Sequence, residues 1–174
     1  REKILALRPD LFVAASYGKL IPKELLGIPK CRLNVHPSLV PKYRGAAPMH
    51  WPILNGDEET GVSIIDIGEK LDAGVVYAQE RFVIRPRMNA VELGMELSEL
   101  SYRLLKQTLA KVQNGTLKGI PQDESKVTLA PQLKKEDGKL TFDQPAEILD
   151  RKVRGLKPWP GTFFFLRNER VAVL

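Results

Sequence analysis

Asn34 and His36 are two side chains whose types and spacing could do chemistry together. They lie at the end of an apolar run that begins at Cys31 and predicts a buried strand. Side chains two positions apart on a strand project to the same side, so an amide and an imidazole should face one pocket. Such groups can donate hydrogen bonds to a developing oxyanion and transfer a proton.

The segment Ser38-Leu39-Val40-Pro41 follows at once and is predicted to be a rigid loop. Pro37 and Pro41 remove two backbone donors and fix φ at their positions, which excludes a regular helix. A loop of this kind can hold a flat ligand against its backbone. The sequence therefore predicts a ligand-binding loop directly after the strand that carries Asn34 and His36.

Asp72 is a third candidate, in a predicted loop between two strands. Taken singly, each candidate also has a structural interpretation. Asn34 fits a turn residue that bonds its own backbone, and His36 fits a half-buried histidine with satisfied hydrogen bonds. Asp72 fits a loop aspartate beside Gly74. All three candidates follow strands, however, and ligands bind at that edge of open parallel α/β sheets, which favours a shared site.

The composition is that of a globular protein, with 174 residues of which 43% are hydrophobic. No apolar run approaches the roughly twenty residues that span a bilayer, and the amino terminus has no signal pattern, so we expect no membrane partner. The single cysteine, Cys31, lies in an apolar strand, where we expect a core side chain rather than a nucleophile. It can form no disulfide within the chain.

The net charge of +6 favours an anionic partner, although a solvated basic surface explains it equally well. No Gly-x-Gly-x-x-Gly motif follows a strand and no phosphate-binding loop is present, so we expect no nucleotide cofactor. One cysteine and two histidines offer no usual zinc set, so we expect no metal.

The first predicted elements indicate an α/β arrangement. A helix ends before Pro9, and the apolar run Leu11–Ala15 is typical of a strand buried on both faces of a parallel sheet. A short helix at Pro22–Leu26 leads to the strand that ends at Val35. These elements form a βαβ crossover, which is almost always right-handed.

Three further elements precede a long helix. Ala46–Asn55 predicts a helix in which Pro52 should make the start irregular or cause a kink. Gly61–Ile67 and Gly74–Ile84 predict strands.

Leucines spaced by three and four residues predict a helix over Ala90–Gln113, preceded by the capping pair Asn89 and Glu92. Periodicity then ends, and the polar composition from Thr116 to Gly138 predicts a linker.

After the linker, Lys139–Phe142 predicts a short strand and Pro145 opens a helix that runs through Leu156. Two apolar runs about a polar turn predict a hairpin at 163–166 and 171–174.

Several ordered motifs resemble the 10-formyltetrahydrofolate-dependent formyltransferase family. In chain order they are Asn34-Val35-His36-Pro37-Ser38-Leu39-Val40-Pro41, Tyr43-Arg44-Gly45-Ala46-Ala47-Pro48, Thr60-Gly61-Val62-Ser63-Ile64 and Leu71-Asp72-Ala73-Gly74. Within the family, Ala46-Ala47-Pro48 and the run from Arg154 to Gly161 most resemble the methionyl-tRNA formyltransferases. The family's usual Leu-Leu is Leu39-Val40 here, which should alter shape more than chemistry. The resemblance covers nearly the whole chain.

The resemblance implies an α/β fold: a Rossmann-like formyltransferase domain with part of its parallel sheet, followed by the start of an OB-like β-barrel domain. The opening strands and most of the C-terminal domain are then expected to lie outside this sequence. We expect the second half of the catalytic domain over 1–115, a linker over 116–138 and the start of the C-terminal domain over 139–174.

By the same resemblance, Asn34, His36 and Asp72 are the catalytic residues. Asn34 and a protonated His36 would donate to the oxyanion. Asp72 would hold His36 and accept the proton, directly or through a water. Ser38, Leu39, Val40 and Pro41 would lie against the folate. The loop Tyr17–Leu20 would line the pterin pocket, although its residues fit an ordinary loop equally well.

The reaction expected from the resemblance is formyl transfer from 10-formyltetrahydrofolate to the amino group of initiator methionyl-tRNA, in support of translation initiation. We expect a monomer in the bacterial cytoplasm or an organelle matrix. The alternatives are another folate-dependent formyltransferase, such as a sugar-nucleotide enzyme, a 10-formyltetrahydrofolate hydrolase, or an RNA-binding module without catalysis.

Some charged residues keep two interpretations. Arg44 fits an anion-binding side chain and a structural ion pair equally well. His50 matches no catalytic position of the family, so we expect it in a surface or packing role. The basic residues after the linker, Arg151 and Lys152 among them, are expected to contact tRNA phosphates, although their helical spacing also permits pairing with neighbouring acids.

Overall fold

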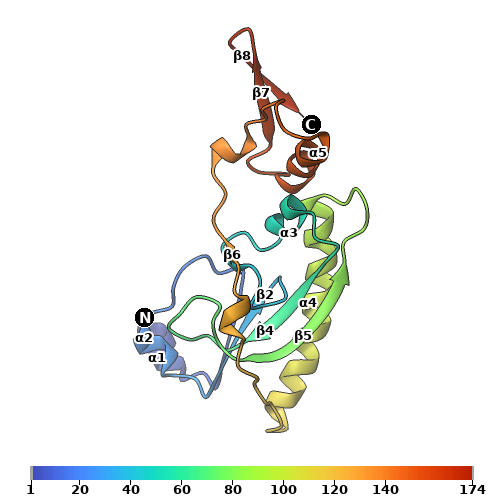
Figure 1. Cartoon of the computed structure of the whole chain (residues 1–174). Coiled ribbons are helices and arrows are strands. Elements are labelled where there is room, and N and C mark those ends of the chain that lie inside the picture. The colour runs from blue at the N-terminus through green and yellow to red at the C-terminus, as the bar shows by residue number, and fades with distance from the viewer. Residues whose placement is uncertain (1, 174) are drawn as a thin grey trace.

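The computed structural model describes residues 2–173 (Figure 1). The helices are α1 (Glu2–Leu7), α2 (Lys23–Leu26), α3 (His50–Asn55), α4 (Ala90–Gln113) and α5 (Ala146–Gly155). The strands are β1 (Leu11–Ala15), β2 (Cys31–His36), β3 (Arg44–Gly45), β4 (Glu59–Ile65), β5 (Val76–Val83), β6 (Leu129–Ala130), β7 (Thr162–Leu166) and β8 (Glu169–Val173). Two short 3₁₀ helices lie at Glu124–Lys126 and Lys135–Gly138. Within residues 2–173, no helix is both long and apolar enough to cross a bilayer.

The main sheet has the strand order β1-β2-β4-β5. β1 pairs with β2 in parallel, as the predicted βαβ crossover requires, but β2–β4 and β4–β5 are antiparallel. The expectation of a parallel sheet is therefore correct for one pair only. The connection from β4 to β5 is a short loop, and a parallel pairing would need a crossover of about a dozen residues or more. The sheet is mixed, and the fold remains α/β.

The edge strand β1 is less buried than its apolar sequence predicts. Its side chains are half-buried or exposed, and Val13 is 44% exposed. The prediction of burial on both faces is wrong here because β1 has a neighbour on one side only, in the strand order described.

The core lies between the sheet and α4, which Figure 1 shows running behind β4 and β5. Leu93 and Leu97 of α4 are buried against Leu33 of β2 and Ile64 of β4. The predicted capping box is present, since the Asn89 side chain accepts from two backbone N–H groups and Glu92 returns a bond to the Asn89 backbone. The bounds of this helix agree with the prediction because periodicity and caps are local signals.

The helix predicted over Ala46–Asn55 begins only at His50. Pro52 is the third residue of this shorter helix, in the first turn, where backbone N–H groups have no partner within the helix. The proline therefore costs no hydrogen bond within the helix. The predicted irregular start is confirmed, because residues 48 and 49 form a turn before the helix begins. The strand predicted at Lys139–Phe142 is also wrong, because only Lys139 forms an isolated bridge, to Phe163.

The segment predicted as a linker, 116–138, lies along β5 and β3 rather than away from them. Figure 1 shows it returning from the end of α4 past β6 toward α5. Ile120 exchanges two backbone hydrogen bonds with Val76, and β6 pairs in parallel with β3. Beyond it, α5 packs against α3, and His50 shares a hydrogen bond of 2.8 Å with the Gly155 carbonyl. His50 thus has the packing role expected of it.

Candidate active site

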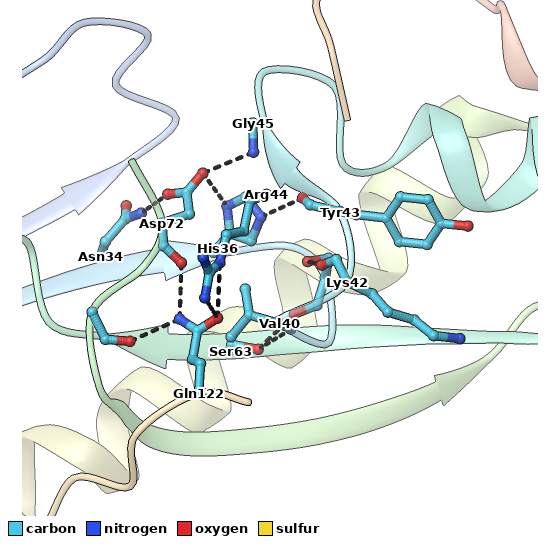
Figure 2. Close-up of polar contacts among 12 residues, drawn as sticks. Asn34, His36, Val40, Lys42, Tyr43, Arg44, Gly45, Ser63, Asp72 and Gln122 are labelled. Atoms are coloured by element: carbon cyan, nitrogen blue, oxygen red, sulfur yellow. Dashed lines mark hydrogen bonds and ion pairs between the residues drawn. The ribbon is translucent and has the colours of Figure 1, made fainter. Parts of the chain in front are cut away.

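Asn34 and His36 both contact the Asp72 carboxylate (Figure 2). β2 alternates, so that Leu33 and Val35 enter the core while Asn34 and His36 project to the other side. The Asn34 amide donates to Oδ1 of Asp72 over 3.0 Å. Nδ1 of His36 lies 3.6 Å from Oδ2 of the same carboxylate.

Asp72 reaches the site by a route that the sequence did not predict. β4 runs antiparallel to β2, with Ile65 opposite Asn34, so the three residues do not share the carboxyl edge of parallel strands. A loop closed by the hydrogen bond from Asp66 N to Val75 O carries Asp72 back across the sheet. The loop needs glycine at Gly74, because a Cβ there would collide with the backbone of Asp66.

Backbone groups at the short strand β3 and at Tyr43, the residue before it, contact both ionisable groups. The Gly45 N–H donates to Oδ2 of Asp72 over 2.9 Å, and Nε2 of His36 lies 2.9 Å from the Tyr43 carbonyl. Gly45 has φ of 129°, and a Cβ at this position would lie 2.6 Å from the Ala130 carbonyl oxygen. Only glycine allows β3 to lie this close to β6 and keep the bond to Asp72.

These contacts fix where protons can lie. A carbonyl can only accept, so Nε2 of His36 carries a hydrogen and Nδ1 faces Asp72. The Nδ1–Oδ2 contact is attractive only when a proton lies between the two atoms. His36 is 4% exposed and Asp72 8% exposed, so water screens this pair little. The carboxylate also accepts hydrogen bonds from the Asn34 side chain and the Gly45 N–H.

The predicted ligand loop, 38–41, is packed tightly against the sheet. The Ser38 hydroxyl is fully buried and donates to the Lys42 carbonyl over 2.7 Å. Ser63 donates to the Ser38 carbonyl and accepts from the Val40 N–H, while Gln79 donates to the Val40 carbonyl. These polar groups are therefore engaged within the protein.

Leu39 and Pro41, the other two residues of the ligand loop, are half-buried. They offer a partly open apolar surface on a fixed backbone. In contrast, Tyr17 and Leu20 of the loop predicted to line a pterin pocket are exposed.

The Arg44 side chain is hydrogen-bonded to other side chains of the protein. The residue is 7% exposed, and its guanidinium donates to Oε1 of Gln122 and to both carboxylate oxygens of Glu124. Of the two interpretations that the sequence left open, the structure shows the ion pair. The hydrogen bonds from this guanidinium are also the largest cause of a lowered pKa of Glu124.

Sequence reasoning missed three groups that contact the candidates: the Tyr43 carbonyl, the Gly45 N–H and the side chain of Gln122. Two of them are backbone atoms, whose role no side-chain type reveals. Gln122 lies in a polar stretch that composition alone assigns to a linker. Among residues 2–173, no three histidine, cysteine, aspartate or glutamate side chains are grouped so that they could hold a metal ion.

Comparison with known proteins connects this geometry to a family. A model described as "Formyl transferase" matches residues 1–109, and one described as "Formyl transferase, C-terminal domain" matches residues 132–174. A methionyl-tRNA formyltransferase of Thermus thermophilus is 47% identical over 174 residues, which cover 99% of this chain and 56% of that protein. The methionyl-tRNA formyltransferase of Thermodesulfovibrio yellowstonii is 41% identical over 175 residues, with the same coverage of 99% and 56%.

The chain thus spans 56% of the length of these two relatives. Among solved structures, that of HypX from Aquifex aeolicus in complex with tetrahydrofolic acid superposes with a TM-score of 0.85 at 25% identity. The match covers 98% of this chain and 30% of the HypX chain.

Proposed function

The chain belongs to the formyl transferase family, and we propose that the protein carrying it transfers a formyl group from 10-formyltetrahydrofolate to the amino group of methionyl-tRNA. The observation that supports this proposal most is the contact of Asn34, His36 and Asp72 in a chain 41% and 47% identical to methionyl-tRNA formyltransferases. The reaction is proposed for the whole protein, since these relatives are longer than this chain.

In this reaction the methionyl nitrogen attacks the formyl carbon, a C–N bond forms, and the carbonyl electron pair moves to oxygen. Asn34 supplies a donor for this oxyanion, because its amide has a second N–H beside the one bonded to Asp72. His36 contributes less directly than expected from the resemblance. Its Nε2–H is bonded to the Tyr43 carbonyl, so it is not free to donate to the oxyanion in this arrangement.

The attacking amine must also lose a proton, and the His36–Asp72 pair is suited to accept it. A proton taken up between Nδ1 and Oδ2 turns a repulsive contact into an ion pair in a buried environment. The tetrahedral centre then collapses, the bond to the folate nitrogen breaks, and that nitrogen takes the electron pair and a proton. Asp72 therefore acts with His36 as the acid–base group.

We propose that folate lies against the ligand loop formed by Ser38, Leu39, Val40 and Pro41. The apolar surfaces of Leu39 and Pro41 would contact it, while buried Ser38 and Val40 keep the loop rigid. The HypX structure, which superposes on this chain, contains tetrahydrofolic acid, and this supports a folate in the family fold. The exposed loop Tyr17–Leu20 is the proposed pterin-side contact.

The remaining assignments are proposals of the same kind. Residues 1–115 form part of the catalytic domain, 116–138 connect it, and 139–174, with the hairpin β7–β8, begin an OB-like domain that contacts initiator tRNA. The protein is proposed to act as a monomer. The proposed location is the bacterial cytoplasm, because the two relatives compared are bacterial.

An acceptor comparison tests the proposal. The full-length gene product is incubated with 10-formyltetrahydrofolate and methionyl-tRNA, uncharged tRNA, an amino sugar nucleotide, or no acceptor. Of the four conditions, we expect formyl incorporation only in the one that contains methionyl-tRNA. Rapid formate release without an acceptor would instead indicate a hydrolase, and incorporation into the sugar would indicate a sugar enzyme.

A further inference from the structure

The Asp72 backbone adopts a conformation that needs outside support. Its φ is 51°, in the left-handed region that non-glycine residues adopt uncommonly. It also lies in the loop between β4 and β5, outside the hydrogen-bonded strands of the sheet. Contacts from elsewhere must therefore hold this residue if its carboxylate is to keep a fixed position.

Gln122 supplies such contacts. Its side-chain amide nitrogen donates one hydrogen bond of 2.8 Å to the Asp72 carbonyl and another of 2.7 Å to the Gly74 carbonyl (Figure 2). A primary amide has two hydrogens, so both bonds can form together. One side chain thus bridges two carbonyls on either side of Ala73.

Arg44 fixes the orientation of that amide. Its Nε and Nη2 donate to Oε1 of Gln122 over 3.0 and 2.8 Å, so the amide oxygen faces the guanidinium and the amide nitrogen faces the Asp72 loop. Glu124 contacts the same guanidinium from an exposed position, where water weakens its effect. Arg44 itself is buried, and its effect on the Asp72 loop comes from its two hydrogen bonds to Gln122.

Of the three consecutive residues Tyr43, Arg44 and Gly45, the first and third contact the acid–base pair directly, and Arg44 is linked to it through Gln122. The Tyr43 carbonyl accepts from His36, the Gly45 N–H donates to the Asp72 carboxylate, and Arg44 acts on the Asp72 backbone through Gln122. Asp72 is consequently held at both its side chain and its main chain.

We propose that Gln122 is a positioning residue for Asp72, with Arg44 as its support, in the formyl transfer proposed above. Gln122 lies outside the residues matched by either family model, which end at 109 and resume at 132. The segment between the two matched regions thus contributes to the site. It is more than a connection between domains.

The substitution Gln122→Glu tests this inference in the full-length protein. It keeps the shape and the oxygen that accepts from Arg44, but it removes both donors and sets a carboxylate against two carbonyls. We expect kcat to fall by about 10- to 100-fold, the scale for a misplaced catalytic group, with KM for 10-formyltetrahydrofolate changed little. Exposed Gln132→Glu is the matched control and should leave kcat unchanged.

A second readout does not require activity. Nitrogen NMR of labelled histidine in the ligand-free protein reports the protonation of the His36 ring, which should change in Gln122→Glu as Asp72 moves, and remain the same in Gln132→Glu. If the parent protein does not transfer formyl to methionyl-tRNA, the proposed function fails, and this signal alone decides the positioning role.

A kcat within twofold of the parent together with an unchanged His36 signal would overturn the inference. The inference would also be overturned if Gln122→Glu lost thermal stability but kept a normal kcat per folate-binding site and a normal pH profile. That result would show that Gln122 has a purely structural role. If Gln122→Glu does not fold, Gln122→Asn replaces it. The shorter amide cannot span both carbonyls, so the same drop in kcat and the same change in the His36 signal are expected, and their absence contradicts the inference.

Discussion

The side-chain amide of Asn34 on β2 lies 3.0 Å from Oδ1 of Asp72, which is 38 positions further on, in the loop between β4 and β5. This contact leaves one N–H of Asn34 for a reacting oxygen and orients the carboxylate toward His36. The proposed chemistry depends on this relationship.

The substitution Asn34→Ala should therefore impair the reaction more than the fold. We expect kcat to fall by about 10²- to 10³-fold, the usual loss when an oxyanion donor is removed. KM for 10-formyltetrahydrofolate should change much less. Steady-state kinetics check this, with exposed Asn114→Ala as the control. A variant that keeps more than a tenth of the parent kcat would remove Asn34 from the mechanism.

Gly45→Ala should destabilise the protein and the site together. The added methyl would lie 2.6 Å from the Ala130 carbonyl, on a residue with φ of 129°. We expect the free energy of unfolding in urea to fall by about 2 kcal/mol or more. Gly27→Ala is the matched control, because no atom lies within 4 Å of its added Cβ. Equal stability of the two variants would show that β3 tolerates a side chain there.

Stability should decline in strongly alkaline solution because of the phenols of Tyr43, which is buried, and Tyr77, which is half-buried. Burial raises the pKa of Tyr43, and likewise that of Tyr77, to about 12 in each case. Unfolded tyrosines ionise near pH 10, so the unfolded state loses these protons first. The stabilisation is therefore present below about pH 10 and lost as pH rises toward about 12.

Urea unfolding at about pH 9 and about pH 11 measures this loss. The double variant Tyr43→Phe, Tyr77→Phe should lose less stability between the two pH values than the parent does. Tyr102→Phe, at an exposed position, should behave as the parent. If the double variant and the parent lose the same amount, the two phenols do not cause the decline.

The sequence predicts elements better than it predicts their directions. The helix α4 has its predicted bounds because leucine spacing and the Asn89 capping box act over a few residues. The antiparallel course of β4 and β5 depends on which strand each one meets, and apolar runs do not encode this. Two site contacts use backbone atoms of Tyr43 and Gly45, which have no signature in the sequence.

The basic face of α5 should contribute to tRNA affinity through phosphate contacts. Arg154 is paired within the protein, because it donates to Asp150 and to the Met88 carbonyl. The residues proposed to contact phosphates are therefore Arg151 and Lys152. The double substitution Arg151→Ala, Lys152→Ala should weaken tRNA binding and reduce the salt slope by about one to two.

Binding titrations at several salt concentrations check this prediction, and formyl transfer to a minimal amine acceptor should persist in the double variant. The matched control is Lys106→Ala, Lys111→Ala on α4. An unchanged salt slope in the Arg151, Lys152 variant would mean that this face is only solvated. Arg151 also donates to the Asn55 carbonyl, so thermal unfolding is measured alongside.

The central claim is that Asp72, held by Asn34, Gly45 and His36, takes part in formyl transfer to an amine. Its most direct test is the single-turnover rate of formyl transfer from 10-formyltetrahydrofolate to methionyl-tRNA in Asp72→Asn, with exposed Asp143→Asn as the control. We predict a rate about 10²- to 10³-fold below that of the parent, with methionyl-tRNA still bound. A folded Asp72→Asn protein that transfers formyl at nearly the parent rate would contradict the account.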